Sequence, residues 1–294
     1  MRLVEFNIMS HYLKILFSAL FVFSTLSLSA NAQTIVNENA MASSACPATG
    51  DMVAQDGDCR VTPSTFSTKI YEIGLCTAHP YGAAKTSATF DASTCVVIYA
   101  DAAPAAVDLA AAIGTNTSLP GTASAPPEGT YGFPYIKLGT DFTVAGSFTN
   151  TPTGGVATTF YSRGAGNAVN TTGPAVTQTD SLKNFGDTLC SSGYVGAAVV
   201  GGTMDGFITN TAFTRSIDTD KSGNPVICNK SDRLVAVMNL AAPFTVTSQT
   251  YAVNFNFILT NYGAQFVDGN STAGAPEEFA SAPFAGYFTV LNAD

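Results

Sequence analysis

The clearest pattern in the chain is an alternation of apolar and polar side chains near its C-terminal end. Every second residue there is apolar: Tyr251, Val253, Phe255, Phe257 and Leu259. Asn254 and Asn256 stand between them. Because successive side chains of a strand point to opposite faces, this spacing predicts a β-strand with its aromatic face buried and its asparagines outward. A slip of one residue would exchange the two faces, so we expect a fixed register.

Similar patterns predict strands elsewhere. Tyr71, Ile73 and Leu75 alternate with polar or small residues, as in a half-buried strand. Further strands are expected at residues 142–148, 207–213, 234–240 and 284–291. Gly, Pro, Asn and Asp clusters separate these stretches and indicate turns.

Two other stretches carry a different signal. Residues 95–99 (Cys-Val-Val-Ile-Tyr) are continuously apolar and rich in β-branched side chains, which predicts a strand covered on both faces. Residues 102–113 fit a short helix between Pro104 and Gly114, and residues 107–109 fit an edge strand equally well. No long helical periodicity occurs, so we expect an all-β fold. The predicted architecture is an antiparallel β-sandwich of the jelly-roll or prealbumin-like kind, as one large or two packed β units.

The N-terminal residues have the layout of an export signal. Lys14 precedes an apolar run at residues 15–28, and Ala30-Asn31-Ala32 supplies small residues before Gln33. The run of about 14 residues is short of the roughly 20 that span a bilayer. We therefore expect residues 1–32 to be a signal peptide, with Met9 as an alternative start.

The predicted organisation follows from that cleavage. Residues 33–62 form an N-terminal arm, residues 63–150 a first β unit and residues 151–294 a second. The protein is expected outside the cell or on its surface, or alternatively in the periplasm, with no membrane span in the mature chain.

The chain has six cysteines, all after the predicted cleavage site. An even number in an oxidising compartment indicates disulfides. Proximity in sequence favours the pairs Cys46–Cys59, Cys76–Cys95 and Cys190–Cys228. A zinc site is the alternative, but no Cys-x-x-Cys pair occurs and cleavage leaves His79 as the one histidine, so metal thiolates are not expected.

Composition excludes some partners. The formal net charge is −9, charged residues make up 11 % of the chain, and no basic run occurs, so a nucleic-acid partner is not expected. Hydrophobic residues make up 46 %, too many for a disordered chain. Low charge with abundant Ala, Gly, Ser and Thr is typical of exported structural and surface proteins.

Catalytic motifs are scarce. A serine triad needs a histidine base, and His79, before Pro80, is expected to be a polar loop residue. No Gly-x-Ser-x-Gly elbow occurs. Glycoside hydrolysis needs two carboxylates, but Glu277 and Glu278 lie in a Gly-, Ala- and Pro-rich stretch that predicts a solvated turn. We expect no catalytic residue and no enzymatic activity.

One segment resembles part of a calcium loop. Its alternating oxygen ligands would be Asp218, Asp220, Ser222 and Asn224. Gly223 would allow the sharp bend, but Asn229 at the twelfth position cannot supply a bidentate carboxylate. An ordinary surface turn is the alternative. Calcium is thus the one cofactor that the sequence suggests.

A resemblance to known proteins lies between residues 107 and 163. It is carried by Pro127-Glu128-Gly129-Thr130-Tyr131, Tyr135-Ile136-Lys137-Leu138, residues 142–148 and Tyr161-Ser162-Arg163. These segments resemble parts of uncharacterised secreted proteins of marine Gram-negative bacteria. The Gly-Thr-Tyr turn, with residues 107–109 before it, is also similar to prealbumin-like modules of bacterial surface proteins. The resemblance implies a secreted β-sandwich and carries over no activity or site residue.

The functional expectation is a secreted, non-enzymatic structural or cell-surface protein, such as a filament, sheath or matrix subunit. It would self-associate through an exposed edge strand, or by lending residues 33–45 to a neighbour. The alternative is an extracellular module that binds a glycan or a surface, with Tyr131, Phe133 and Tyr135 as an aromatic strip. Three aromatic residues at this spacing equally suit one face of a core.

Overall fold

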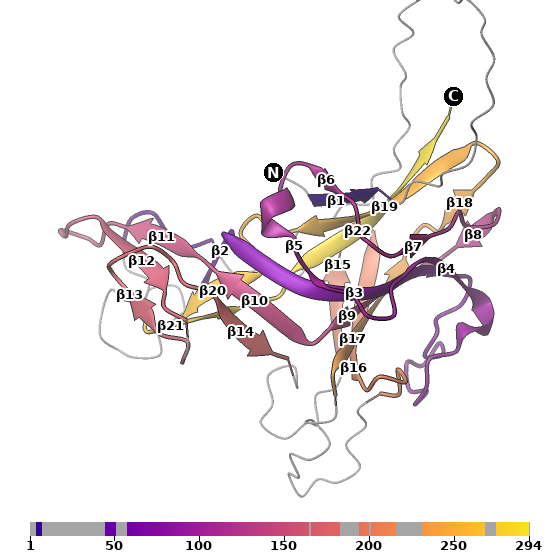
Figure 1. Cartoon of the computed structure of the whole chain (residues 1–294), viewed down its shortest axis with the longest axis horizontal. Helices are drawn as coiled ribbons and strands as arrows, with labels where there is room; N and C mark the ends of the chain where they lie inside the picture. Colours follow the sequence, from indigo (N-terminus) through magenta and orange to yellow (C-terminus); the bar gives the residue numbers. More distant parts are fainter. Residues whose placement is uncertain are drawn as a thin grey trace, which may run out of the picture.

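The computed structural model is all-β, as expected. It describes residues 4–7, 45–50, 58–164, 166–182, 194–199, 201–215, 231–267 and 275–293. Two short 3-10 turns, η2 (Ala92–Thr94) and η3 (Ala110–Ala112), are the helical elements of this part of the chain. Figure 1 shows the long strand β3 (Thr65–Cys76) running through the middle of the molecule.

The central sheet holds ten strands. In spatial order its main path is β14 (Gln178–Ser181), β10 (Asp141–Ala145), β3, β9 (Phe133–Gly139), β17 (Arg233–Leu240), β16 (Gly202–Thr209) and β15 (Tyr194–Val199). Off this path lie β4 (Cys95–Ala100), β5 (Ala106–Asp108) and β7 (Thr122–Ala123). Strands from residues 63–150 and from residues 151–294 thus belong to one sheet, and the sheet does not divide near residue 151.

A second sheet has the order β22 (Ala285–Asn292), β19 (Thr250–Ile258), β1 (Val4–Asn7) and β6 (Asn116–Thr117). Three smaller sheets complete the fold. They are β11 (Ser147–Asn150), β12 (Thr158–Ser162) and β13 (Val169–Asn170); β2 (Asp58–Val61), β20 (Ala264–Val267) and β21 (Glu278–Ser281); and β8 (Gly129–Tyr131) with β18 (Phe244–Val246). Among the described strands, β1 and β6 form the one parallel pair.

The main hydrophobic core joins the central sheet to the second sheet. The ring of Phe284, just before β22, lies 5.6 Å from Phe66 of β3, 5.7 Å from Phe142 of β10 and 5.6 Å from Phe257 of β19. Apolar residues of β3, β9 and β17 belong to the same buried cluster. Opposed sheets that bury their inner faces in this way form a sandwich-like core.

The strand expected at residues 251–259 is present as β19, but one part of its prediction is wrong. Phe255 and Phe257 are buried as expected, whereas Asn254 and Asn256 are buried as well, with 3 % and 1 % of their surface exposed. Asn256 Nδ2 donates to the Tyr287 carbonyl and to Thr289 Oγ1 of the neighbouring β22, which offsets part of the cost of its burial. Tyr251, expected on the buried face, is 57 % exposed because it lies at the start of the strand.

Other strand predictions hold with changed limits. The strands expected around Ile73 and at residues 234–240 and 284–291 are present. The stretch 142–148 is divided between β10 and β11, and β16 ends at Thr209, before Phe213. Residues 102–113 contain both alternatives, β5 followed by η3.

The expectation that residues 95–99 form a strand covered on both faces is half wrong. The strand is present as β4, but Val97 is 43 % exposed. Besides β3, β4 pairs only with the two-residue β7 among the described strands, so it lies at the margin of the sheet.

Two predicted disulfides, Cys46–Cys59 and Cys76–Cys95, are confirmed. The third predicted pair, Cys190 with Cys228, lies outside the described residues.

Candidate functional site

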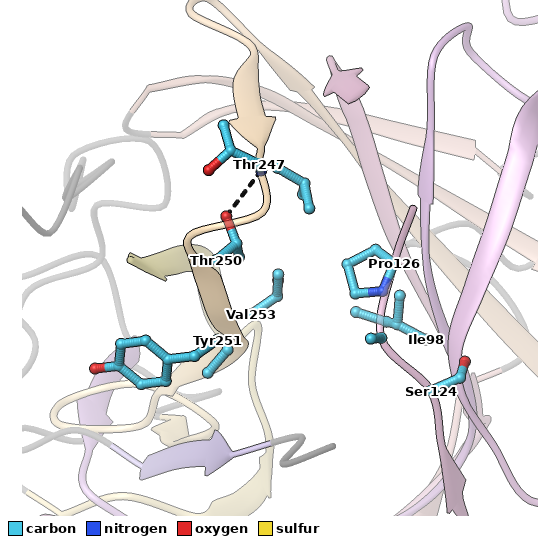
Figure 2. Close-up of a pocket in the computed structure, with 10 residues that line it drawn as sticks. Ile98, Ser124, Pro126, Thr247, Thr250, Tyr251 and Val253 are labelled. Carbon is cyan, nitrogen blue, oxygen red and sulfur yellow. Dashed lines mark hydrogen bonds between the residues drawn. The ribbon is translucent and has the colours of Figure 1, made fainter. Parts of the chain in front are cut away.

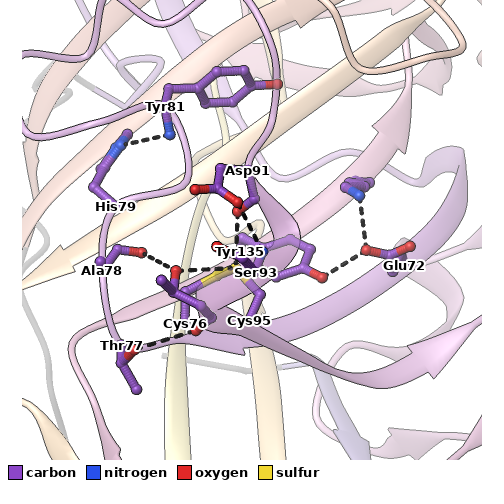
Figure 3. The surroundings of a disulfide bond; sticks show 12 residues. Glu72, Cys76, Thr77, Ala78, His79, Tyr81, Asp91, Ser93, Cys95 and Tyr135 are labelled. Carbon is purple, nitrogen blue, oxygen red and sulfur yellow. Dashed lines mark hydrogen bonds and ion pairs between the residues drawn. A yellow bond between two sulfur atoms is a disulfide. The ribbon is translucent and has the colours of Figure 1, made fainter.

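The face of the central sheet opposite the main core carries a second buried cluster. Its members are Cys76, Tyr81, Tyr135, Phe207, Val235 and Val237. The loop 77–94, between β3 and β4, contributes Tyr81 to it, and the Cys76–Cys95 disulfide closes this loop (Figure 3). We call loop 77–94 the cover loop.

Strand alternation explains why one sheet supports two cores. On β9, Ile136 and Leu138 belong to the main core, while Tyr135 belongs to the second cluster. On β17, Leu234 belongs to the main core and Val235 to the second cluster. In a sequence, a strand that is buried on both faces is a continuous run of apolar residues, and residues 234–238 form such a run.

Asp205 of β16 is the centre of a buried polar network beneath the cover loop. Its side chain is fully buried. Oδ1 accepts a 2.9 Å hydrogen bond from Lys85 Nζ and a 2.8 Å bond from the Tyr194 hydroxyl. Oδ2 lies 3.4 Å from His79 Nε2, a contact longer than a strong hydrogen bond. The carboxylate thus joins two residues of the cover loop to strands β15 and β16.

The charged groups of this network stabilise each other's ionised forms. Burial alone would raise the pKa of Asp205, but the contacts from His79, Lys85 and Tyr194 outweigh it and leave this pKa below its ordinary value. The hydrogen bond with Asp205 likewise raises the pKa of Lys85. Both groups are therefore charged at neutral pH, and Asp205 is the compensated buried charge that such a site requires.

Both ring nitrogens of His79 face other protein groups. Nδ1 accepts a 3.1 Å hydrogen bond from the backbone N–H of Tyr81, which assigns the proton of the neutral ring to Nε2, facing Asp205 (Figure 3). A general base needs a free lone pair directed at its nucleophile, and the Nδ1 lone pair is already engaged. The expectation of a loop position holds, but His79 is only 8 % exposed and its Nε2 lies near a buried carboxylate, a contact that sequence reasoning missed.

A second charged group, Lys137 of β9, lies under the far end of the cover loop. Its ammonium lies 4.0 Å from the ring centre of Phe90 and 3.9 Å from that of Phe213, between two aromatic faces. Nζ is 2.8 Å from Glu72 Oε1, which also accepts a 2.6 Å bond from the Tyr135 hydroxyl. Burial lowers the pKa of Lys137, and Glu72 opposes this effect.

Gly74 of β3 makes room for this arrangement. It pairs across the sheet with Tyr135, whose ring covers it so closely that a Cβ atom at Gly74 would collide with the ring. The ring can then extend along β3 until its hydroxyl reaches Glu72. A glycine within a strand often marks such a close approach.

Two residues of the network adopt backbone conformations that are uncommon for their type. Lys85 and Phe213 have φ angles of 59° and 58°, in the left-handed region that non-glycine residues seldom occupy. One contributes the amine at Asp205 and the other a ring at Lys137. These conformations cost free energy, so they persist only because the surrounding contacts offset that cost.

The segment after β16 completes the cluster. Tyr81 donates a 3.0 Å hydrogen bond to the Phe213 carbonyl, and the Arg215 backbone N–H donates to the Ala88 carbonyl. The Arg215 guanidinium also donates to the Lys85 carbonyl. The charged groups described beneath the cover loop thus all contact other parts of the protein, and these contacts fasten the loop to the sheet. We call this set of contacts the clamp.

A groove opens elsewhere, between β19 and residues 124–126. It is lined by Ile98, Ser124, Pro126, Val246, Thr247, Thr250, Tyr251 and Val253, among others (Figure 2). Its cavity volume of about 40 Å³ holds a few water molecules. The Thr250 hydroxyl is engaged, since it accepts from the Thr247 N–H and donates to Asn292 Oδ1.

The structure separates the residues of the proposed aromatic strip. Tyr131 lies in the main core, with 4 % of its surface exposed, whereas Tyr135 lies in the second cluster, with 1 % exposed. Phe133 packs against the second cluster. The three rings therefore form core contacts on two faces rather than a surface strip. Glu277 and Glu278 are exposed, as the solvated-turn prediction expects, although Glu278 begins β21.

The candidate calcium ligands Asp218, Asp220, Ser222 and Asn224 lie outside the described residues. Within the described ranges, no three His, Cys, Asp or Glu side chains come close enough to share a metal ion. The same part of the chain contains no helix that is both long and apolar enough to cross a membrane.

Comparison with known proteins gives no relative: no family model matches the chain, and neither the curated proteins nor the solved structures contain a significant match.

Proposed function

We propose that this protein is a secreted structural or cell-surface subunit that self-associates through the edge of its central sheet. The observation that carries the proposal is strand β15, which ends the path of strands in that sheet. Among the described strands, β16 is its one neighbour, so no described strand pairs with the backbone groups of its other side. Such an edge can pair with a strand of another molecule.

The side chains of β15 favour this pairing. Residues 194–199 (Tyr-Val-Gly-Ala-Ala-Val) contain no charge and no proline, the two devices that most often protect an edge. Tyr194 and Val195 are 37 % and 39 % exposed. At the opposite end of the sheet, β14 carries Asp180 and is the less suitable edge for association.

The remaining features agree with an extracellular subunit. The two disulfides suit an oxidising compartment. The polar network under the cover loop is used for internal contacts, as expected of a rigid building block. Binding of a glycan or another surface is the alternative function.

A single lysine tests the proposal. Val195→Lys places a charge on β15, and Val156→Lys is the matched control, because Val156 is 81 % exposed in the loop between β11 and β12, outside this edge. We expect the native protein and the control to form assemblies that grow with concentration in sedimentation velocity and electron microscopy, and Val195→Lys to stay monomeric. A native protein that is monomeric at every concentration, or assembly unchanged by Val195→Lys, would contradict the proposal.

A further inference from the structure

The edge strand β15 is attached to the cover loop through the side chain of its first residue. The Tyr194 hydroxyl donates to Asp205 Oδ1 at 2.8 Å, and Lys85 Nζ of the cover loop donates to the same oxygen at 2.9 Å. The ring of Phe207 lies 5.2 Å from that of Tyr194 and 4.2 Å from that of Tyr81 in the cover loop. One carboxylate and one aromatic ring of β16 thus connect the loop with the edge strand.

Gly196 makes room for this attachment. It pairs with Asp205 in the β15–β16 ladder, and a Cβ atom at Gly196 would lie 2.7 Å from the Tyr194 hydroxyl oxygen. A larger residue would therefore displace the hydroxyl from the carboxylate. Among the described strands, β16 is the one that pairs with β15. The position of β15 therefore depends on this side-chain contact as well as on its backbone pairing with β16.

The Cys76–Cys95 disulfide closes the base of the cover loop (Figure 3). Lys85 lies near the middle of this 19-residue separation, so its contact with Asp205 competes with the conformational freedom of the loop. One side of the base is β4, which lies at the margin of the sheet. A covalent link at the base restricts the open loop and thereby favours the closed one.

We propose that formation of the Cys76–Cys95 disulfide orders the edge strand β15, by holding the cover loop on Asp205, and so controls self-association. In this step the two thiols lose two protons and two electrons, one S–S bond forms, and a disulfide oxidant is reduced to a dithiol. The control of self-association rests on the proposed function, whereas the ordering of β15 does not. The chain thus acquires its association edge in an oxidising compartment and not before.

The closed loop orders β15 through burial of the contacts that they share. Asp205 is fully buried beneath the loop, and a hydrogen bond in a buried site is stronger than one exposed to water. When the loop opens, Lys85 and Tyr81 leave, and the bond from Tyr194 to Asp205 must compete with water. β15 then keeps its ladder with β16 but loses its anchor. A strand that is already ordered loses less conformational entropy on pairing with a second molecule, so the closed loop favours association.

Hydrogen exchange, at a protein concentration where the chain is monomeric, tests the ordering step. Cys76→Ala/Cys95→Ala should lower the protection of the amides of residues 195–199 at least about tenfold. The amides of β17, between β9 and β16, should stay protected. Cys46→Ala/Cys59→Ala, which opens a 13-residue separation, is the matched control and should leave β15 unchanged. Substitution replaces a chemical reductant here because a reductant acts on both disulfides.

Tyr194→Phe separates the route through Asp205 from a general loss of stability. It keeps both disulfides and the ring beside Phe207 and removes only the hydroxyl. Protection of residues 195–199 should again fall about tenfold, as expected when a hydrogen bond to a charged group is lost, while that of residues 77–94 stays. Unchanged protection of β15 in Cys76→Ala/Cys95→Ala or in Tyr194→Phe would overturn the proposal. An equal loss in Cys46→Ala/Cys59→Ala would overturn it as well.

Sedimentation velocity over a range of concentrations tests the control of self-association. Cys76→Ala/Cys95→Ala should assemble only at a concentration at least about tenfold higher than the native protein requires, and Cys46→Ala/Cys59→Ala at the native concentration. Native-like assembly of a variant whose β15 has lost protection would overturn this control. A native protein that stays monomeric would overturn the proposed function and the control together. Loss of β15 protection in the disulfide variant would still confirm that Cys76–Cys95 orders the strand.

Discussion

The imidazole of His79 faces the buried carboxylate of Asp205 across 3.4 Å, while its other nitrogen accepts a hydrogen bond from the Tyr81 backbone. The histidine that the sequence predicted to be a polar loop residue therefore has its Nδ1 lone pair engaged and its Nε2 turned toward Asp205. It joins the cover loop to strand β16, together with the hydrogen bond from Lys85 to the same carboxylate. The contact explains how a loop rich in turns stays fixed on the sheet.

Replacement of Asp205 by Asn should destabilise the protein by about 2 to 4 kcal/mol, because it removes the carboxylate that compensates Lys85 and accepts from Tyr194. Urea unfolding measures the effect. Glu128→Gln removes one negative charge at an exposed position and should change stability by less than about 0.5 kcal/mol. Equal effects of the two variants would show that Asp205 contributes through net charge alone.

The same carboxylate predicts a loss of stability in acid. Its folded pKa lies below the unfolded value of about 3.9, so folding favours the ionised form. The stabilisation is complete above the unfolded pKa and is lost as the pH falls through the folded pKa. Urea unfolding between neutral pH and about pH 2.5 should show the native protein converging toward Asp205→Asn below about pH 4. A constant difference between the two proteins over that range would contradict the shift.

The raised pKa of Lys85 predicts a loss of stability at alkaline pH. Its pKa is raised by the hydrogen bond with Asp205, so its contribution is complete below the unfolded value of about 10.4 and is lost as the pH rises beyond it. Lys85→Met should remove this alkaline dependence while leaving the fold intact at neutral pH. The folded fraction at high pH, followed by near-ultraviolet circular dichroism, tests the prediction, and an unchanged alkaline transition in Lys85→Met would count against it.

Lys137 and Glu72 should be strongly coupled. Lys137→Met leaves the Glu72 carboxylate with the Tyr135 hydroxyl, at 2.6 Å, as its remaining hydrogen-bond donor among the described residues, and should cost about 2 to 4 kcal/mol. The double variant with Glu72→Gln should recover part of this loss, because no uncompensated charge remains. Thermodynamic double-mutant cycles measure the coupling. Additive single effects would mean that the pair contributes no interaction energy.

The Cys76–Cys95 disulfide should control the order of the cover loop. Replacing both cysteines by Ala opens the loop between two residues that are 19 positions apart. The free energy of unfolding should fall by about 3 kcal/mol. Limited proteolysis should then cut first within residues 77–94. The matched variant without Cys46–Cys59, a 13-residue separation, should leave that loop resistant. Initial cleavage at the same sites in both variants would show that the clamp of Asp205 and Lys137, rather than the disulfide, holds the loop.

Strand identity followed from local pattern, but burial did not. The alternation at residues 251–259 correctly predicted β19. It placed Asn254 and Asn256 outward because a single strand does not reveal what lies over its polar face. Likewise, residues 95–99 had the composition of a central strand, yet Val97 is exposed because β4 lies at a margin of its sheet.

The candidate site was beyond the reach of sequence analysis. Asp205 lies 120 residues after Lys85 in the chain, and no spacing connects it with the cover loop that carries His79 and Lys85. The same holds for Glu72, Lys137 and the rings of Phe90 and Phe213. A weak signal existed in Lys137 itself, a charge between the buried residues of a strand, since such a charge requires a partner.

By itself, the sequence determined the β class, the positions of several strands and the two confirmed disulfide pairs, because period-two alternation and proximity of cysteines act over short stretches. Only the tertiary structure decided the strand order, the two-sided burial of the central sheet and the partners of its buried charges. These depend on contacts between residues far apart in the chain, where side-chain packing and desolvation, rather than local backbone preference, set the free energy.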